Sequence, residues 1–86
     1  MVITQQELSV YSKTNHIVKI FAVMNGSKEK PIWELWFQIK GEKNKALLVT
    51  SLNKPRKFPR LNNMVLFVQG ICPDVEDICL NIKCYD

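Results

Sequence analysis

The segment from Ile32 to Lys40 alternates between apolar and polar positions, and this alternation constrains the fold more than any other feature. Its apolar positions are Trp33, Leu35, Phe37 and Ile39, and the positions between them are Glu34, Trp36, Gln38 and Lys40. A period of two is typical of a β-strand with one face on a core and the other towards solvent. Trp36 is the exception, because it is a large aromatic residue on the polar face. We therefore expect a half-buried strand and treat Trp36 as a candidate contact residue.

Three other segments predict strands around it. Ile17–Met24 is apolar on both faces, which is typical of an interior strand or of one covered by helices. Gly41–Asn44 predicts a hairpin loop, after which Lys45–Leu52 returns as the paired strand. Near the C-terminus, Ile78–Cys84 alternates again and predicts a last strand.

Two segments have helical patterns. Thr4 followed by Glu7 forms a capping box, in which each side chain can bond a free backbone N–H of the other, and this predicts a helix over Gln5–Ser12. The second helix is predicted over Leu61–Gln69, with Gly70 as its left-handed C-terminal cap. Its apolar stripe consists of Leu61, Met64, Val65 and Val68. That spacing suits a helix lying on a sheet.

The elements follow the order αβββαβ and predict one domain over residues 1–86. We expect an α+β two-layer sandwich, with a mainly antiparallel four-stranded sheet and both helices on one face. A chain of 86 residues is long enough to build a single core. No apolar run is long enough to span a membrane, and the N-terminus lacks the pattern of a secretory signal. We therefore expect a cytoplasmic protein.

Residues with catalytic or metal-binding chemistry are few. Cys72, Cys79 and Cys84 form no CxxC pair, and His16 is the only histidine. A zinc site needs four such ligands, so we predict no metal and no cofactor, and free thiols in a reducing cytoplasm. His16 has no evident nucleophile beside it in the sequence, and the glycines form no phosphate-binding loop. We therefore predict no enzyme activity and no small-molecule substrate.

Charge is unevenly distributed along the chain. The net charge is +4, with seven basic residues and one acid between residues 40 and 60, whereas residues 73–86 carry four acids and one lysine. This asymmetry indicates an anionic partner, although a solvated surface would look the same. The predicted binding residues are Trp36 and the basic residues Lys43, Lys45, Lys54, Arg56, Lys57 and Arg60. We call residues 54–60 the basic connector and expect Phe58 to anchor it to the core.

A resemblance follows from short motifs along the chain. The pieces, in order, are Thr4-Gln5-Gln6, the strand around Trp33, Arg56-Lys57-Phe58, the helix led by Leu61, and Gly70-Ile71. Together they resemble the small ParC-type partition-associated proteins of plasmids and mobile elements. The chain departs from that pattern in the loop 26–31, in the acidic segment 73–77 and at the helix cap, where Arg60 replaces a polar residue. The resemblance implies an accessory protein of a mobile element and gives no mechanism.

Three functional hypotheses remain open at this stage. The first is a non-enzymatic accessory module that docks its basic connector and the Trp36 face on nucleic acid in a partition or regulatory complex, which predicts strong salt dependence. The second is a protein-interaction module or inhibitor that binds an acidic surface, with Trp36 and Arg56 as dominant contacts. The third is a structural homo-oligomer, such as a homodimer through an unpaired sheet edge.

Overall fold

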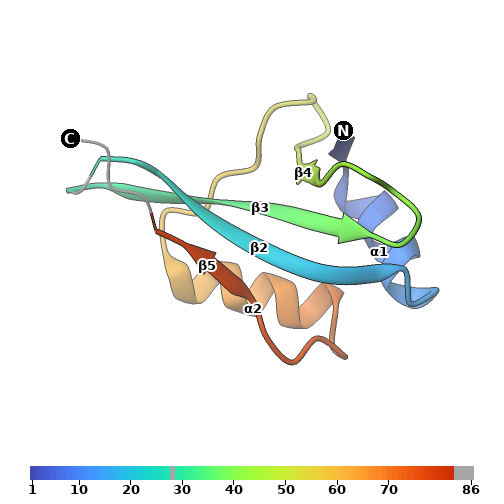
Figure 1. The fold of residues 1–86 in the computed structure, drawn as a ribbon. Coiled ribbons are helices and arrows are strands. Elements are labelled where there is room, and N and C mark those ends of the chain that lie inside the picture. Colours follow the sequence, from blue (N-terminus) through green and yellow to red (C-terminus); the bar gives the residue numbers. More distant parts are fainter. Residues whose placement is uncertain (28, 83–86) are drawn as a thin grey trace.

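A computed structural model describes residues 1–27 and 29–82. It shows a five-stranded mixed sheet, in the order β1-β4-β3-β2-β5, and two helices (Figure 1). In chain order the elements are β1 (Val2–Ile3), α1 (Gln5–Lys13), β2 (Ile17–Gly26), β3 (Pro31–Ile39), β4 (Ala46–Leu48), α2 (Leu61–Ile71) and β5 (Cys79–Asn81). The predicted α+β class is confirmed. The prediction of four mainly antiparallel strands is wrong, because short strands at both edges pair in parallel with their neighbours.

The centre of the sheet is an antiparallel meander of β2, β3 and β4. It contains the predicted alternating strand and the predicted hairpin loop, in which Gly41 adopts a positive φ of 87°. β4 ends at Leu48, four residues before the predicted end. The reason is that Val49 forms a bridge with Pro55, and the Thr50 N–H donates to the Lys54 carbonyl at 2.7 Å, which closes a turn.

The edge strands come from the two ends of the chain. β1 lies parallel to β4, with Val2 opposite Leu47, and the sequence analysis did not predict it. β5 lies parallel to β2, with Phe21 opposite Cys79. β5 covers less than the predicted strand Ile78–Cys84, and Cys84 lies outside the described residues.

Both predicted helices are present. The Thr4–Glu7 capping box is confirmed, since the Thr4 hydroxyl accepts from the Glu7 N–H and the Glu7 carboxylate accepts from the Thr4 N–H. α2 begins at Leu61 as predicted, after Arg60, whose side chain makes no cap hydrogen bond. The prediction for Gly70 is wrong, because α2 continues through it to Ile71 and Cys72 is the C-terminal cap.

The core lies between one face of the sheet and the two helices. The four alternating residues of β3 that were predicted to face the core, Trp33, Leu35, Phe37 and Ile39, are all buried. Leu8 of α1 and Met64 and Val68 of α2 belong to the same cluster. Both helices therefore cover the same face of the sheet. The residues between the buried positions of β3 are only partly buried, so within the described chain the other face is left without a helix.

Candidate functional site

The seven predicted binding residues do not gather into one patch. Phe58 of the basic connector exchanges two backbone hydrogen bonds with Trp33, at 2.8 and 2.9 Å, near the start of β3. The loop that carries Lys43 and Lys45 follows Ile39, at the other end of the same strand (Figure 1). Phe58 therefore lies at the opposite end of β3 from this loop, whereas Pro55 and Arg56 run beside Val49 and Leu48 at the end of β4. The predicted residues divide into separate groups.

The first group consists of Trp36, Lys43 and Lys45. Trp36 lies on the sheet face that the helices leave uncovered, which we call the open face. Trp36 is partly exposed and lies directly opposite Phe21 on β2 and Leu47 on β4. The register extends this into one row across all five strands, formed by Val2, Leu47, Trp36, Phe21 and Cys79. The polar alternation of β3 therefore does not describe the whole open face, because β2 and both edge strands add apolar residues to it.

Lysine side chains lie along one side of this row, towards the loop that joins β3 to β4. The Lys45 Nζ lies 3.8 Å from the centroid of the Phe21 ring, and the Lys19 Nζ lies 5.4 Å from it. Lys45 immediately precedes β4, so its side chain must cross β3 to reach β2. Lys43 lines a shallow depression of the open face together with Trp36, Phe21 and Lys45. The aromatic pair therefore has cations over and beside it.

Charge on the open face changes along the strands. Lys19 pairs with Gln38 at the lysine-bearing end, whereas Glu34 lies opposite Val23 on the far side of the Phe21–Trp36 pair. An anionic ligand would therefore favour the end with Lys19, Lys43 and Lys45. Lys19 and Phe21 were not among the predicted site residues, because only the register of β2 against β3 brings them beside Trp36.

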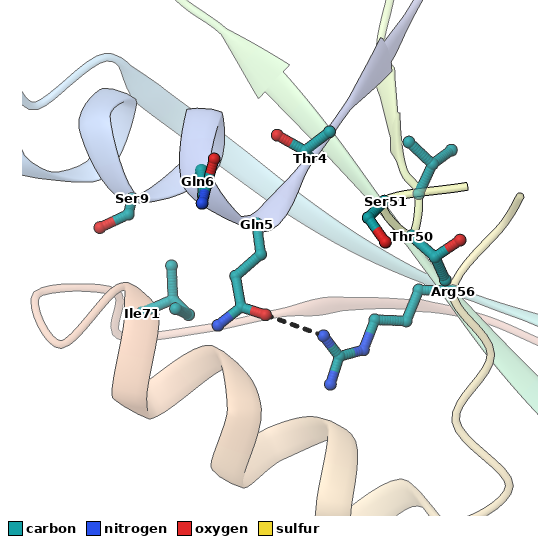
Figure 2. A pocket seen from close by; sticks show the side chains of 9 residues that line it. Thr4, Gln5, Gln6, Ser9, Thr50, Ser51, Arg56 and Ile71 are labelled. Atoms are coloured by element: carbon teal, nitrogen blue, oxygen red, sulfur yellow. Dashed lines mark hydrogen bonds between the residues drawn. The ribbon is translucent and has the colours of Figure 1, made fainter. Parts of the chain in front are cut away.

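Arg56 lies on the opposite, helix-covered side of the sheet. Its Nη1 donates to the Gln5 Oε1 of α1 at 2.9 Å (Figure 2). Its guanidinium carbon lies 4.5 Å from the centroid of Phe67 in α2. Phe58 is buried and packs on Phe67 with ring centroids 5.3 Å apart, which confirms its predicted anchoring role. Arg56 thus connects the basic connector to both helices.

The remaining predicted residues are on the surface. Lys54 ends the turn that follows β4, Lys57 lies between Arg56 and the anchored Phe58, and Arg60 precedes α2. All three are exposed. They share the basic connector with Arg56, which alone among the four contacts the helices through Gln5 and Phe67.

An open cleft of about 890 Å³ lies beside Arg56, between α1, the turn after β4 and the end of α2 (Figure 2). Its walls are formed by Thr4, Gln5, Gln6, Ser9, Val49, Thr50, Ser51, Arg56 and Ile71. These residues come from three distant segments, and none of the segments carries a recognisable ligand motif. The sequence therefore carries no local signal for the cleft, and no small-molecule site was predicted.

Cys72 is buried and Cys79 is half-buried, whereas His16 is exposed. Burial raises the pKa of the Cys72 thiol, and a hydrogen bond with Ser12 partly opposes this effect. The Nδ1 of His16, which is exposed, lies 2.7 Å from the Thr14 hydroxyl. Over residues 1–27 and 29–82, no three His, Cys, Asp or Glu side chains are grouped closely enough to hold a metal ion. No helix in the same ranges is long and apolar enough to cross a membrane.

Comparison with known proteins gives no relative for this chain: no family model, curated protein or solved structure matches it. The resemblance to ParC-type proteins therefore stays a prediction from short motifs.

Proposed function

We propose that this protein is a non-enzymatic binding module that holds single-stranded nucleic acid against its open face. The observation that carries the proposal is the pairing of Trp36 with Phe21 on the two central strands, with Lys45 lying over the Phe21 ring. Aromatic side chains on an uncovered sheet face can stack on unpaired bases, and each stacked base contributes about 1–3 kcal/mol. Paired bases in a duplex offer no such faces, so single strands are the favoured ligand.

The lysines supply the second part of this mechanism. Lys19, Lys43 and Lys45 stand at one end of the aromatic pair, where they can neutralise phosphates of a strand whose bases lie on Trp36 and Phe21. In this mechanism the Lys45 side chain leaves the Phe21 ring for a phosphate when a base takes its place. Contacts of this kind carry no sequence information, so we expect little sequence preference.

A second function is favoured by the apolar row across the five strands. Val2 is 49 % exposed, and it continues the row to the sheet edge through Leu47 and Trp36. An apolar row of this length also suits a protein partner or a second copy of the chain. In that case Trp36 and Phe21 would be the dominant contacts, and binding would depend weakly on salt.

The setting of the proposed activity follows from the sequence analysis. The ParC-type resemblance supports an accessory role on a plasmid or other mobile element, in the bacterial cytoplasm. Single-stranded nucleic acid is available in such a setting during replication and transfer of the element. The basic connector is not part of the proposed strand-binding surface, and it provides the matched control for the experiment.

The test uses tryptophan fluorescence in a Trp33→Phe background, which leaves Trp36 as the only tryptophan. Titration with oligothymidine at low salt should quench the emission and saturate. With three lysines engaged, the logarithm of the binding constant should fall with the logarithm of salt concentration at a slope of about −2, at about −0.7 per phosphate neutralised. Duplex DNA of the same length should bind more weakly.

Two variants with equal charge loss locate the site. Replacing Lys19, Lys43 and Lys45 with alanine should weaken binding by at least about tenfold at low salt and flatten the slope. Replacing Lys54, Lys57 and Arg60 with alanine removes the same charge from the connector and should leave most of the affinity. Equal losses in both variants would show non-specific attraction to a basic protein. No quenching at low salt, together with a concentration-dependent mass in light scattering, would favour the second function.

A further inference from the structure

We propose that the cleft beside Arg56 binds a carboxylate group, carried either by a small polar molecule or by the C-terminal end of a peptide. This site lies on the helix-covered side of the sheet, so it is independent of the proposed nucleic-acid surface. Its central group is the Arg56 guanidinium, and its walls are the neutral polar residues of α1 and of the turn after β4 (Figure 2).

Arg56 is held in place before any ligand arrives. One hydrogen bond joins its Nη1 to the Gln5 Oε1 at 2.9 Å, and two aromatic rings, Phe67 and Phe58, lie 4.5 and 5.4 Å from its guanidinium carbon. A guanidinium held by stacking loses little conformational freedom when it bonds a planar ligand. The hydrogen bond to Gln5 uses a single N–H, and a guanidinium has five, so donors are left for a ligand.

The charge of the cleft favours a singly charged anion. Among the nine residues that line it, Arg56 is the one cation and none is acidic. A carboxylate matches one guanidinium in both charge and shape, since its two oxygens accept a parallel pair of N–H bonds. A phosphate dianion would leave uncompensated charge unless a second cation joined it. The cleft therefore selects carboxylate over phosphate.

The other walls indicate what the carboxylate is attached to. Hydroxyl groups of Ser9, Thr50 and Ser51 and the amide of Gln6 are neutral donors and acceptors, and Val49 and Ile71 add small apolar patches. This lining suits a short polar body, such as an amino-acid derivative or the last residues of a peptide, and it offers no large apolar pocket for a lipid tail.

The test follows the Gln5 side-chain amide and the Arg56 Nε–H by NMR in ¹⁵N-labelled protein. The probes are acetate, N-acetylglycine, a tripeptide with a free or an amidated C-terminus, and inorganic phosphate, all at matched ionic strength against chloride. We expect saturable shifts of both signals with acetate, N-acetylglycine and the free tripeptide, and weaker effects with phosphate. The amidated tripeptide should give no shift. A free tripeptide that binds more tightly than acetate would identify a peptide end, and the reverse order a small molecule.

Three variants make the result decisive. Arg56→Lys keeps the charge but removes the planar fork, and it should weaken acetate binding by about tenfold. Ser51→Trp should block the cleft and abolish binding while leaving Arg56 intact, so the proposal can be tested even if the Arg56 variant is poorly folded. Lys57→Met removes a neighbouring charge outside the cleft and should have no effect.

The proposal is overturned if the shifts follow ionic strength alone, if phosphate binds more tightly than the carboxylates, or if Ser51→Trp binds as well as the wild type. Oligothymidine binding to the open face should be unchanged in Arg56→Lys and Ser51→Trp. The two sites can therefore succeed or fail separately.

Discussion

Trp33 and Trp36 lie three positions apart on the same strand and point to opposite faces of one sheet. Trp33 is 7 % exposed and belongs to the core beneath the helices, whereas Trp36 is partly exposed in the row of the open face. The same alternating pattern thus supplies a core residue and a surface residue from one residue type. The comparison shows that residue size alone does not determine burial, because burial depends on which face the helices cover.

The largest expected effect is a difference in stability between the two tryptophans. Trp33→Ala should lower the free energy of unfolding by about 3–5 kcal/mol, since it leaves a cavity in the core. Trp36→Ala should cost less than about 1.5 kcal/mol, because solvent already reaches its side chain. Urea unfolding followed by circular dichroism would measure both. Equal losses would break the comparison and show that the open face is covered in solution, for example by a second copy of the chain.

The N-terminal cap of α1 should affect one face and leave the other unchanged. Thr4→Ala removes the hydroxyl that accepts from the Glu7 N–H, and it should cost about 1 kcal/mol. Thr4→Ser, which keeps a hydroxyl at the cap, is the matched control and should cost less than about 0.5 kcal/mol. Because α1 covers the core face, oligothymidine binding by folded Thr4→Ala should equal that of the wild type. A reduced affinity would show that the two faces are coupled.

Alanine substitutions at two glycines should change the stability by smaller amounts and in opposite directions. Gly70 lies in α2, and a methyl group there meets no atom within 4 Å, so Gly70→Ala should stabilise the protein by about 0.5–1 kcal/mol. Gly41 has φ of +87°, so Gly41→Ala should destabilise it by about 1 kcal/mol through backbone strain, although space is available there too. Thermal unfolding of both variants would measure these changes. A loss of stability in Gly70→Ala would restore the interpretation of Gly70 as a left-handed cap.

The smallest expected effect is the pH dependence of stability that the thiol of Cys72, on the helix side, adds in the alkaline range. Its pKa is raised above the ordinary value by burial, so the folded protein holds the thiol proton more tightly than the unfolded chain does. Its contribution to stability is complete below the unfolded thiol pKa and is lost as the pH rises through the folded value. The urea midpoints of wild type and Cys72→Ala should differ by a constant amount at neutral pH, and this difference should change above about pH 9. A constant difference into the alkaline range would contradict burial of this thiol.

Local patterns predicted much of the fold from the sequence. The alternation around Trp33 placed β3 and its two faces, and the Thr4–Glu7 capping box placed the start of α1. β1 was missed because two residues carry no pattern and owe their structure to pairing with Leu47 and Leu48, far along the chain. Gly70 was misassigned because a glycine near a helix end has the same sequence signal whether the helix stops before it or continues through it to the next residue, Ile71.

The candidate sites were less predictable than the fold, since both depend on contacts between distant segments. Trp36 could be assigned to a polar face from its own strand, but Phe21 and Lys19 join it only through the register of β2. Arg56 looked like one more surface cation of the basic connector. Its contacts with Gln5 and Phe67 require both helices to pack on the same side of the sheet, and no spacing within residues 54–60 indicates that.

The parallel edge strands have a consequence for how the molecule opens. β1 and β5 are the outermost strands, and each is held by two or three residue pairs to a partner far away in the sequence, whereas β2 and β3 share a long antiparallel ladder. Amide hydrogen exchange in the sheet should therefore begin in β1 and β5 and reach the central hairpin last. The row on the open face would then lose its outer members, Val2 and Cys79, before Trp36 and Phe21 separate.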